Sequence, residues 1–130
     1  MKYNFIFTLA AALLLNCSNT DDDSTFTSIQ GQWQWEHSSS GFTGENLTPE
    51  NTGEQRRLII TTDSIKTYVN QTLSYKSAYS IAKKTSVLYN DTRTMIIDDN
   101  GSKSIITLET NNLKLTHDCF DCFTDVYVRE

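Results

Sequence analysis

The alternation of apolar and polar residues constrains the fold of this chain more than any other feature. Apolar side chains recur at every second position, which is the period of a strand with one buried face. In residues 32–37 this parity places Trp33, Trp35 and His37 together on one face. Residues 73–81 and 113–117 repeat the pattern, while 57–61 and 104–108 are apolar runs rich in β-branched residues. This pattern therefore predicts a fold built from β-strands.

Short polar segments separate the expected strands. Residues 62–64, 70–71, 99–102 and 111–112 have the composition of tight turns, with Gly101 available for a positive φ. Strands at intervals of about 8 to 12 residues favour an antiparallel barrel or sandwich, here of about eight strands. Residues 86–89 fit either a further strand or part of a loop.

The longest connection, residues 38–53, is polar and contains the only proline, Pro49. Thr48 is suited to cap a helical turn that begins with a proline at its first position. We therefore expect one short helical turn inside this connection. A polar loop of this length is either functional or disordered.

The N-terminus has the layout of a secretory signal peptide, with Lys2 before an apolar run of 11 residues, Phe5–Leu15. A membrane-spanning helix needs about 20 residues, so this run is too short to span stably. Leu14-Leu15-Asn16-Cys17 resembles the lipobox of bacterial lipoproteins, which implies cleavage before Cys17 and lipidation of that cysteine. The alternative is an ordinary signal peptide cut at another position. We expect a signal peptide at 1–16, a flexible lipidated tether at 17–28 and one domain at 29–130.

Several acidic residues follow Cys17, at positions 21–23. Such a run resembles the signal that directs lipoproteins of Bacteroidota to the cell surface, and it is equally typical of a solvated linker. The expected location is the outer membrane, held by the lipid anchor, at either the periplasmic face or the cell surface.

Length and charge exclude some classes of function. Without its first 28 residues the chain has roughly 100 residues, enough for one modest core. The net charge is −5, and the basic pairs at 56–57 and 83–84 would point to opposite faces of a strand. Nucleic-acid binding requires clustered cations, so the sequence predicts no nucleic-acid partner.

Cys119 and Cys122 form a Cys-x-x-Cys pair, for which three interpretations exist. In an oxidising compartment, a structural disulfide closing a turn is favoured. A redox dithiol normally opens a helix after a strand, which this pair does not. A metal site with His117 would need a fourth ligand, and the only other histidine, His37, is remote in sequence. We expect the disulfide, with no metal and no cofactor.

Gly31-Gln32-Trp33, opening the first strand, resembles the Gly-x-Trp signature of lipocalins. The segments 33–35, 40–44 and 47–53, with the final hairpin at 113–115 and 123–129, further resemble small lipocalin-like lipoproteins of Bacteroidota. The resemblance covers residues 29 to 130. It implies an all-β fold, an antiparallel up-and-down β-barrel of about eight strands.

The resemblance also implies residue roles. In lipocalins the signature tryptophan closes one end of the barrel beneath a basic residue of the last strand, which pairs Trp33 with Arg129 here. The alternative is that Arg129 is a solvated terminal residue. An eight-stranded barrel either holds one small ligand or is filled by its own side chains. Aromatic and imidazole side chains that would line a cavity, or simply fill the core, are Trp35, His37, Tyr68, Tyr75 and Tyr79.

Two functions compete. The first is a membrane-anchored barrel that binds a small, partly apolar molecule. The second is a non-enzymatic envelope protein with a filled barrel, contacting a protein or glycan through the 38–53 loop. No order of Ser, His and Asp predicts a catalytic triad, so we expect no enzyme activity. Residues 63–65 and 23–25 also resemble short O-glycosylation sites of Bacteroidota, at Ser64 and Ser24. The oligomeric state is not indicated.

Overall fold

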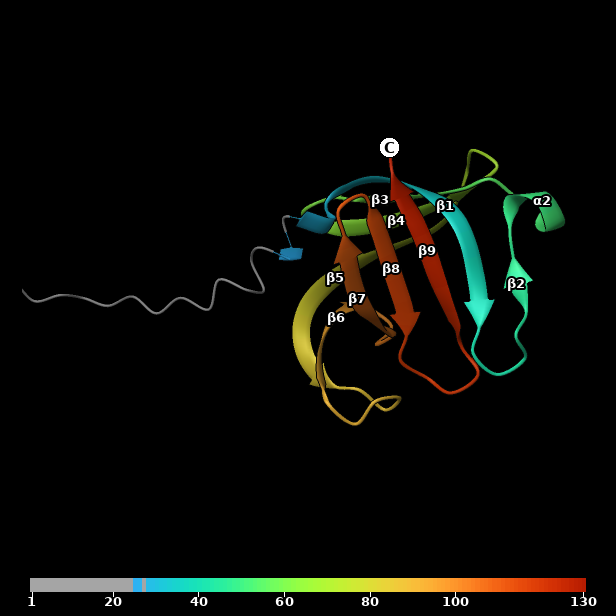
Figure 1. The fold of residues 1–130 in the computed structure, drawn as a ribbon. Coiled ribbons are helices and arrows are strands. Elements are labelled where there is room, and N and C mark those ends of the chain that lie inside the picture. The colour runs from blue at the N-terminus through green and yellow to red at the C-terminus, as the bar shows by residue number, and fades with distance from the viewer. Residues whose placement is uncertain (1–24, 27) are drawn as a thin grey trace, which may run out of the picture.

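Each expected run of alternating residues forms a strand (Figure 1). The computed structural model describes Thr25, Phe26 and residues 28–130. The elements are β1 (Gly31–Ser40), β2 (Asn46–Leu47), α2 (Pro49–Thr52), β3 (Arg56–Ile60), β4 (Ser64–Val69), β5 (Thr72–Thr85), β6 (Thr92–Asp98), β7 (Lys103–Glu109), β8 (Asn112–His117) and β9 (Phe123–Arg129). Residues 86–89 form the loop between β5 and β6.

The strands close into a barrel because β1 pairs with two neighbours. It pairs antiparallel with β3 through residues 31–34 and antiparallel with β9 through residues 33–40. The remaining strands follow one another in chain order, each antiparallel to the next, while β2 pairs only with β1. The fold class is thereby confirmed as an eight-stranded, closed, antiparallel β-barrel with one extra strand, consistent with a lipocalin-like barrel.

The core lies inside the barrel, where alternate residues of each strand meet. Trp33 and Leu113 are completely buried, and Trp35 and Ile60 nearly so. Other members of the core are Ile29, Leu58, Ile96, Leu115 and Tyr127. Their period-two spacing follows from the pleat, which turns successive side chains to opposite faces of the sheet.

One end of the barrel, here called the closed end, is covered by the chain that precedes β1. The described residues Thr25, Phe26 and Ser28 are helical, and they belong to the segment expected to be a tether. The Phe26 ring stacks on Tyr79 with 5.7 Å between ring centroids, and Ile29 is completely buried. The signal peptide, Cys17 and Ser24 lie outside the described residues.

The 38–53 connection is ordered by local hydrogen bonds. β1 continues to Ser40 and turns back into β2, and the expected helical turn follows as α2. The Thr48 hydroxyl accepts from the Asn51 backbone N–H, and the Asn51 side chain accepts from the Thr48 N–H, a reciprocal capping box. Gly53 ends the turn in the left-handed conformation, at φ 70°.

Candidate functional site: the polar mouth of the barrel

The barrel interior contains a cavity of about 150 Å³. Its lining residues are of two kinds, apolar or aromatic residues that we call the floor and polar residues that we call the rim. The floor consists of Leu58, Ile60, Ile65, Ile96, Leu115 and Tyr127, and the rim consists of Thr67, Tyr75, Asp98, Ser102, Ser104, His117 and Asp125. A cavity lined by apolar side chains and a limited number of polar groups suits a partly apolar guest.

A second depression of about 380 Å³ opens at the end opposite the closed end, here called the mouth. It is lined by Ser38, Leu47, Arg56, His117, Asp121, Cys122, Phe123 and Asp125. His117 and Asp125 line both spaces, so these two side chains stand where the inner cavity meets the mouth.

A chain of hydrogen bonds, the mouth network, joins strands β1, β7, β8 and β9. The Trp35 Nε1–H donates to Ser38 Oγ at 2.9 Å, and the Ser38 hydroxyl donates to Asp125 Oδ1. Asp125 Oδ2 lies 3.0 Å from His117 Nε2, and His117 Nδ1 lies 3.2 Å from Ser104 Oγ. Every polar side chain of the network therefore has a partner, as buried polar groups require.

Asp125 carries the buried charge of this network. Burial alone would raise the pKa of its carboxyl group, because a charged carboxylate loses hydration. Hydrogen bonds from His117 and Ser38, together with the charges of His117 and Arg56, outweigh burial and lower that pKa below its ordinary value. Asp125 is therefore held as a carboxylate, a fixed negative charge at the neck of the cavity.

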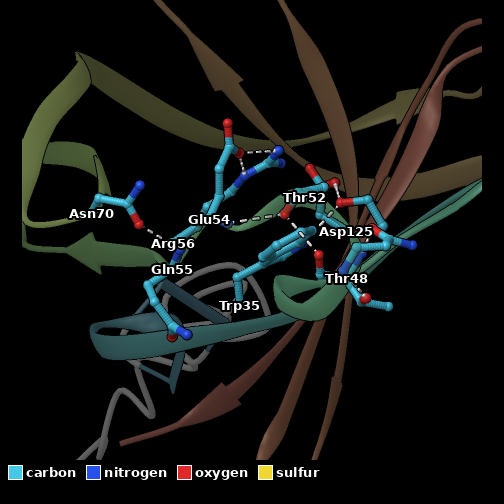
Figure 2. A network of polar contacts seen from close by, with 10 residues as sticks. Trp35, Thr48, Thr52, Glu54, Gln55, Arg56, Asn70 and Asp125 are labelled. Carbon is cyan, nitrogen blue, oxygen red and sulfur yellow. Dashed lines mark hydrogen bonds and ion pairs between the residues drawn. The ribbon is translucent and has the colours of Figure 1, made fainter.

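Arg56 lies next to this carboxylate and above Trp35. Its guanidinium group is 4.1 Å from the Trp35 ring centroid, and its Nη2 lies 2.6 Å from Glu54 Oε2. Figure 2 shows Glu54 and Arg56 meeting over Trp35, with Asp125 beyond the ring. The Asn70 side chain accepts from the Gln55 backbone N–H at 2.8 Å and fixes this segment to the β4–β5 turn.

Tyr75 and Asp98 form a second polar pair on the rim. The Tyr75 hydroxyl donates to Asp98 Oδ2 at 2.6 Å. This hydrogen bond, followed by burial, raises the pKa of Tyr75 above its ordinary value. On the cavity floor, burial and the nearby charge of Asp125 raise the pKa of Tyr127. Both tyrosines therefore stay neutral.

Of the five residues expected to line the barrel cavity, Tyr75 alone lines the inner cavity. Trp35 is 1% exposed and belongs to the core, and Tyr79 is packed against the core. The Tyr79 hydroxyl donates to the Thr61 carbonyl oxygen and its ring contacts Phe26, so it helps to cover the closed end. These two aromatic residues fill space, which is the alternative that the sequence left open.

His37 and Tyr68 lie on the outer wall, contrary to expectation. A β-bulge between Trp35 and His37 shifts the alternation of β1 by one residue, so Ser38 and Ser40 point inward instead. Tyr68 pairs with Arg57, whereas the inward Leu58 pairs with Thr67. Tyr68 and Arg57 line a depression of about 550 Å³ on the outer wall, together with Gln34, Gln55, Arg56, Ile59 and Gln71.

Arg129 lies over Trp33 at the closed end, where the resemblance placed it. The guanidinium group is 4.1 Å from the ring centroid, and it donates to the carbonyl oxygens of Gln30 and Ser28 at 3.2 and 2.7 Å. Gly31 adopts φ +137°, and a Cβ there would lie 3.0 Å from Arg129 Nη1. The close approach of Arg129 accounts for glycine at the start of the Gly-x-Trp sequence.

Cys119 and Cys122 form the expected disulfide in the β8–β9 loop. Ser64, one of the two serines in sites resembling glycosylation motifs, is only 8% exposed and hydrogen-bonds with Thr61. Its hydroxyl is therefore shielded in the folded barrel.

Sequence reasoning missed most of the mouth network. Ser38, Ser104 and Asp125 were not singled out, although His117 was considered as a metal ligand. One signal was present, since Asp125 shares its parity with Phe123 and the inward Tyr127. A charged residue at an inward position of a strand predicts a buried polar partner.

Fold and site together describe a small closed barrel with an inner cavity of mixed lining and a polar mouth, which share His117 and Asp125. The chain matches no known protein family, no curated protein and no solved structure in the comparisons made with them. In the described part of the chain, no helix is long and apolar enough to cross a membrane. Residues 25, 26 and 28–130 contain no group of three or more His, Cys, Asp or Glu side chains arranged to hold a metal ion.

Proposed function

We propose that this chain is a lipid-anchored protein of the bacterial outer membrane that binds one small, partly apolar molecule in its barrel. The observation that carries the proposal is the inner cavity, which has an apolar floor and meets the mouth at His117 and Asp125. An apolar space bordered by a few convergent polar groups is typical of a small-molecule site.

The size of the cavity limits the guest. At about 150 Å³ it falls below the roughly 300–1,000 Å³ of most ligand pockets. An apolar cavity of about this volume accommodates a guest the size of benzene. The buried part of the ligand is therefore one small ring or a short branched chain, and anything larger extends into the mouth.

The rim specifies the polar end of the ligand. Asp98 and Asp125 place two carboxylates on it, while Arg56 is paired with Glu54. Hydrogen bonds to charged acceptors are stronger than those between neutral groups. A hydroxyl or amine donor at the polar end of the ligand suits this rim better than a carboxylate does.

The positions of the proposed anchor and of the mouth favour one orientation of the barrel relative to the membrane. The described chain enters the barrel at the closed end, and the mouth lies at the opposite end of β1 and β9. With lipids on Cys17, the mouth would face away from the membrane and receive a ligand from the aqueous side. Several buried acyl chains would make this attachment stable.

The test of ligand binding uses native mass spectrometry of the full chain, followed by titration with phenol. A discrete adduct that is lost on denaturation supports a hollow barrel, and its mass indicates the ligand class. Thr67→Phe places a ring in the cavity and should weaken phenol binding at least tenfold. Thr92→Phe adds the same ring at an exposed position and should leave binding unchanged. Equal affinity in both variants, or no saturable binding of phenol, contradicts the proposal.

The anchor is tested on the same samples. The denatured mass of the wild type purified from a bacterial host should lack residues 1–16 and carry the added mass of lipid, whereas Cys17→Ser should carry no lipid. An unlipidated wild type rejects the anchor without affecting the proposal for the cavity.

A second candidate function is contact with a protein or glycan through the 38–53 loop. The observation that favours it is Phe42, which is 79% exposed at the tip of this ordered loop. Phe120 of the β8–β9 loop is 73% exposed. Phe42 and Phe120 line one surface depression between these two loops. Crosslinking in intact cells should yield an adduct that Phe42→Ser abolishes and Thr67→Phe preserves, and the reverse result rejects this function.

A further inference from the structure

A separate polar pocket of about 300 Å³ lies on the outer wall of the barrel, beneath the β5–β6 hairpin. We call it the outer pocket. Its lining consists of His37, Ser39, Tyr89, Arg93, Ile105, Thr107, Lys114, Thr116, Thr124 and Val126. None of these lining residues is also a lining residue of the inner cavity or the mouth.

The strand register arranges this wall as two parallel rows. In one row Ser39 is opposite Thr124, and Thr124 is opposite Thr116. In the other row His37 and Lys114 both pair with Val126, one from each side. The β-bulge in β1 produces this arrangement, because it turns His37 outward into line with Lys114.

Two polar side chains of the wall, His37 and Lys114, are available to a ligand, whereas Thr124 donates to the Thr116 hydroxyl at 3.4 Å. Within the described chain, no hydrogen bond or ion pair is formed by the side chains of His37 and Lys114, and the lining contains no carboxylate. Arg93 closes one side, where it is paired with Asp91 and its guanidinium group lies 4.3 Å from the Tyr89 ring centroid. Lys114 is therefore an unpaired cation at a concave surface that also carries the hydroxyls of Ser39, Thr116 and Thr124.

The loop between β5 and β6, which covers the pocket, is fixed in place by Asp118. Its carboxylate accepts hydrogen bonds from the Ser86 hydroxyl at 2.6 Å and from the backbone N–H groups of Val87 and Leu88 at 3.0 and 3.3 Å. The Ser86 hydroxyl in turn accepts from the Tyr89 N–H at 3.1 Å. The pocket is thus preformed, which lowers the entropic cost of binding.

We infer that the outer pocket binds the anionic group of a small hydroxylated organic acid, such as a sugar acid. The carboxylate lies over Val126, between Lys114 and His37, which flank that residue from β8 and β1. The ligand hydroxyls bond to the row formed by Ser39, Thr116 and Thr124, and Tyr89 provides an apolar edge. This site is independent of the inner cavity and of the function proposed for it.

The test titrates the full chain, in a non-ionic detergent, with D-glucuronate, D-glucose and inorganic phosphate. Binding is followed by isothermal calorimetry and by amide shifts in nuclear magnetic resonance spectra. Glucuronate should bind saturably, with shifts at residues 37–39, 114–116 and 124–126. Lys114→Gln should weaken glucuronate binding about tenfold or more, because one charge-assisted contact is lost.

The matched control is Lys76→Gln, which removes the same charge from an exposed position on β5 outside the pocket. It should bind glucuronate as the wild type does, whereas Thr124→Val should weaken binding several-fold. Circular dichroism verifies that each variant is folded. Three results overturn the inference: no saturable binding of glucuronate, equal binding of glucose, and phosphate binding as tight as that of glucuronate. Equal weakening in Lys114→Gln and Lys76→Gln also overturns it, because it indicates general screening.

Discussion

Asp125 is a residue whose contribution depends on pH. In the folded barrel its pKa is below the ordinary value, although burial opposes this, because His117 and Ser38 donate to the carboxylate. A lowered pKa means that the folded state binds this proton less readily than the unfolded chain. The resulting stability is present above the unfolded pKa of about 4 and is lost as the pH falls through the folded value.

Replacing Asp125 with Asn tests this contribution. The amide retains the shape but loses the charge, so Asp125→Asn should reduce the free energy of unfolding at pH 7 by about 1 to 3 kcal/mol. The difference from the wild type should shrink as the pH is lowered below about 4. Urea denaturation at pH 7 and pH 3 measures both effects, and Asp99→Asn in the exposed β6–β7 turn is the charge-matched control. A constant difference at both values would contradict the assigned role.

Arg129 is the second residue for which a substitution is decisive. Arg129→Met removes a cation–π contact and two hydrogen bonds to carbonyl oxygens, and should cost about 1 to 3 kcal/mol. Arg57→Met removes an exposed ion pair with Glu130 and should cost less than about 1 kcal/mol. Thermal unfolding compares the two variants, and equal melting temperatures would show that Arg129 is only a solvated terminal residue.

Among individual contacts, the sequence predicted those that depend on a motif and missed those that depend on strand register. The pairing of Trp33 with Arg129 came from the Gly-x-Trp resemblance, and the Thr48 cap from local spacing. The bonds of Ser38, Ser104 and His117 around Asp125 cross several strands, and their positions depend on the bulge in β1. No local pattern marks that bulge, so His37 was assigned to the wrong face.

Among the elements, the β8–β9 hairpin combines three local constraints. Its loop contains the disulfide, the Asp118 carboxylate that holds the β5–β6 loop, and Asp121 at φ 64°. The disulfide closes a very short loop, so the chain-entropy relation gives it about 2 kcal/mol.

The double variant Cys119→Ser, Cys122→Ser should therefore lose about 2 kcal/mol of unfolding free energy. Urea denaturation with and without a reductant measures this loss. The reductant should destabilise the wild type to the level of the variant and leave the variant unaffected. A reductant effect on the variant would show that another feature responds to the reducing conditions.

The alternation of apolar and polar residues predicted the positions of these strands. The expected strands at 32–37, 57–61, 73–81, 104–108 and 113–117 all lie within or overlap observed strands. The continuous apolar run at 57–61 has no readable parity, so the outward direction of Tyr68 on the neighbouring strand could not be deduced. The register between paired strands, not the local sequence, determines which face of the sheet such side chains occupy.

For the whole molecule, the fold class was predictable and the volume of its cavity was not. The number of strands and the turn spacing indicated a barrel, and closure through β1 and β9 confirms it. Cavity volume depends on how Trp33, Trp35 and Tyr127 fill the space between strands, a three-dimensional property. Their bulk leaves about 150 Å³ open.

Barrel closure also determines when this chain can fold. The first strand is completed only by the last one, because β1 pairs with β9 from Trp33 and Arg129 to Ser40 and Phe123. Contacts between distant parts of a chain form slowly and only after the intervening residues are present. A chain ending at Cys122 lacks β9 and should show no cooperative unfolding transition in urea. During synthesis the domain should therefore stay unfolded until β9 emerges. On the proposed export route, this delay would keep the chain extended enough to pass through a membrane before it folds.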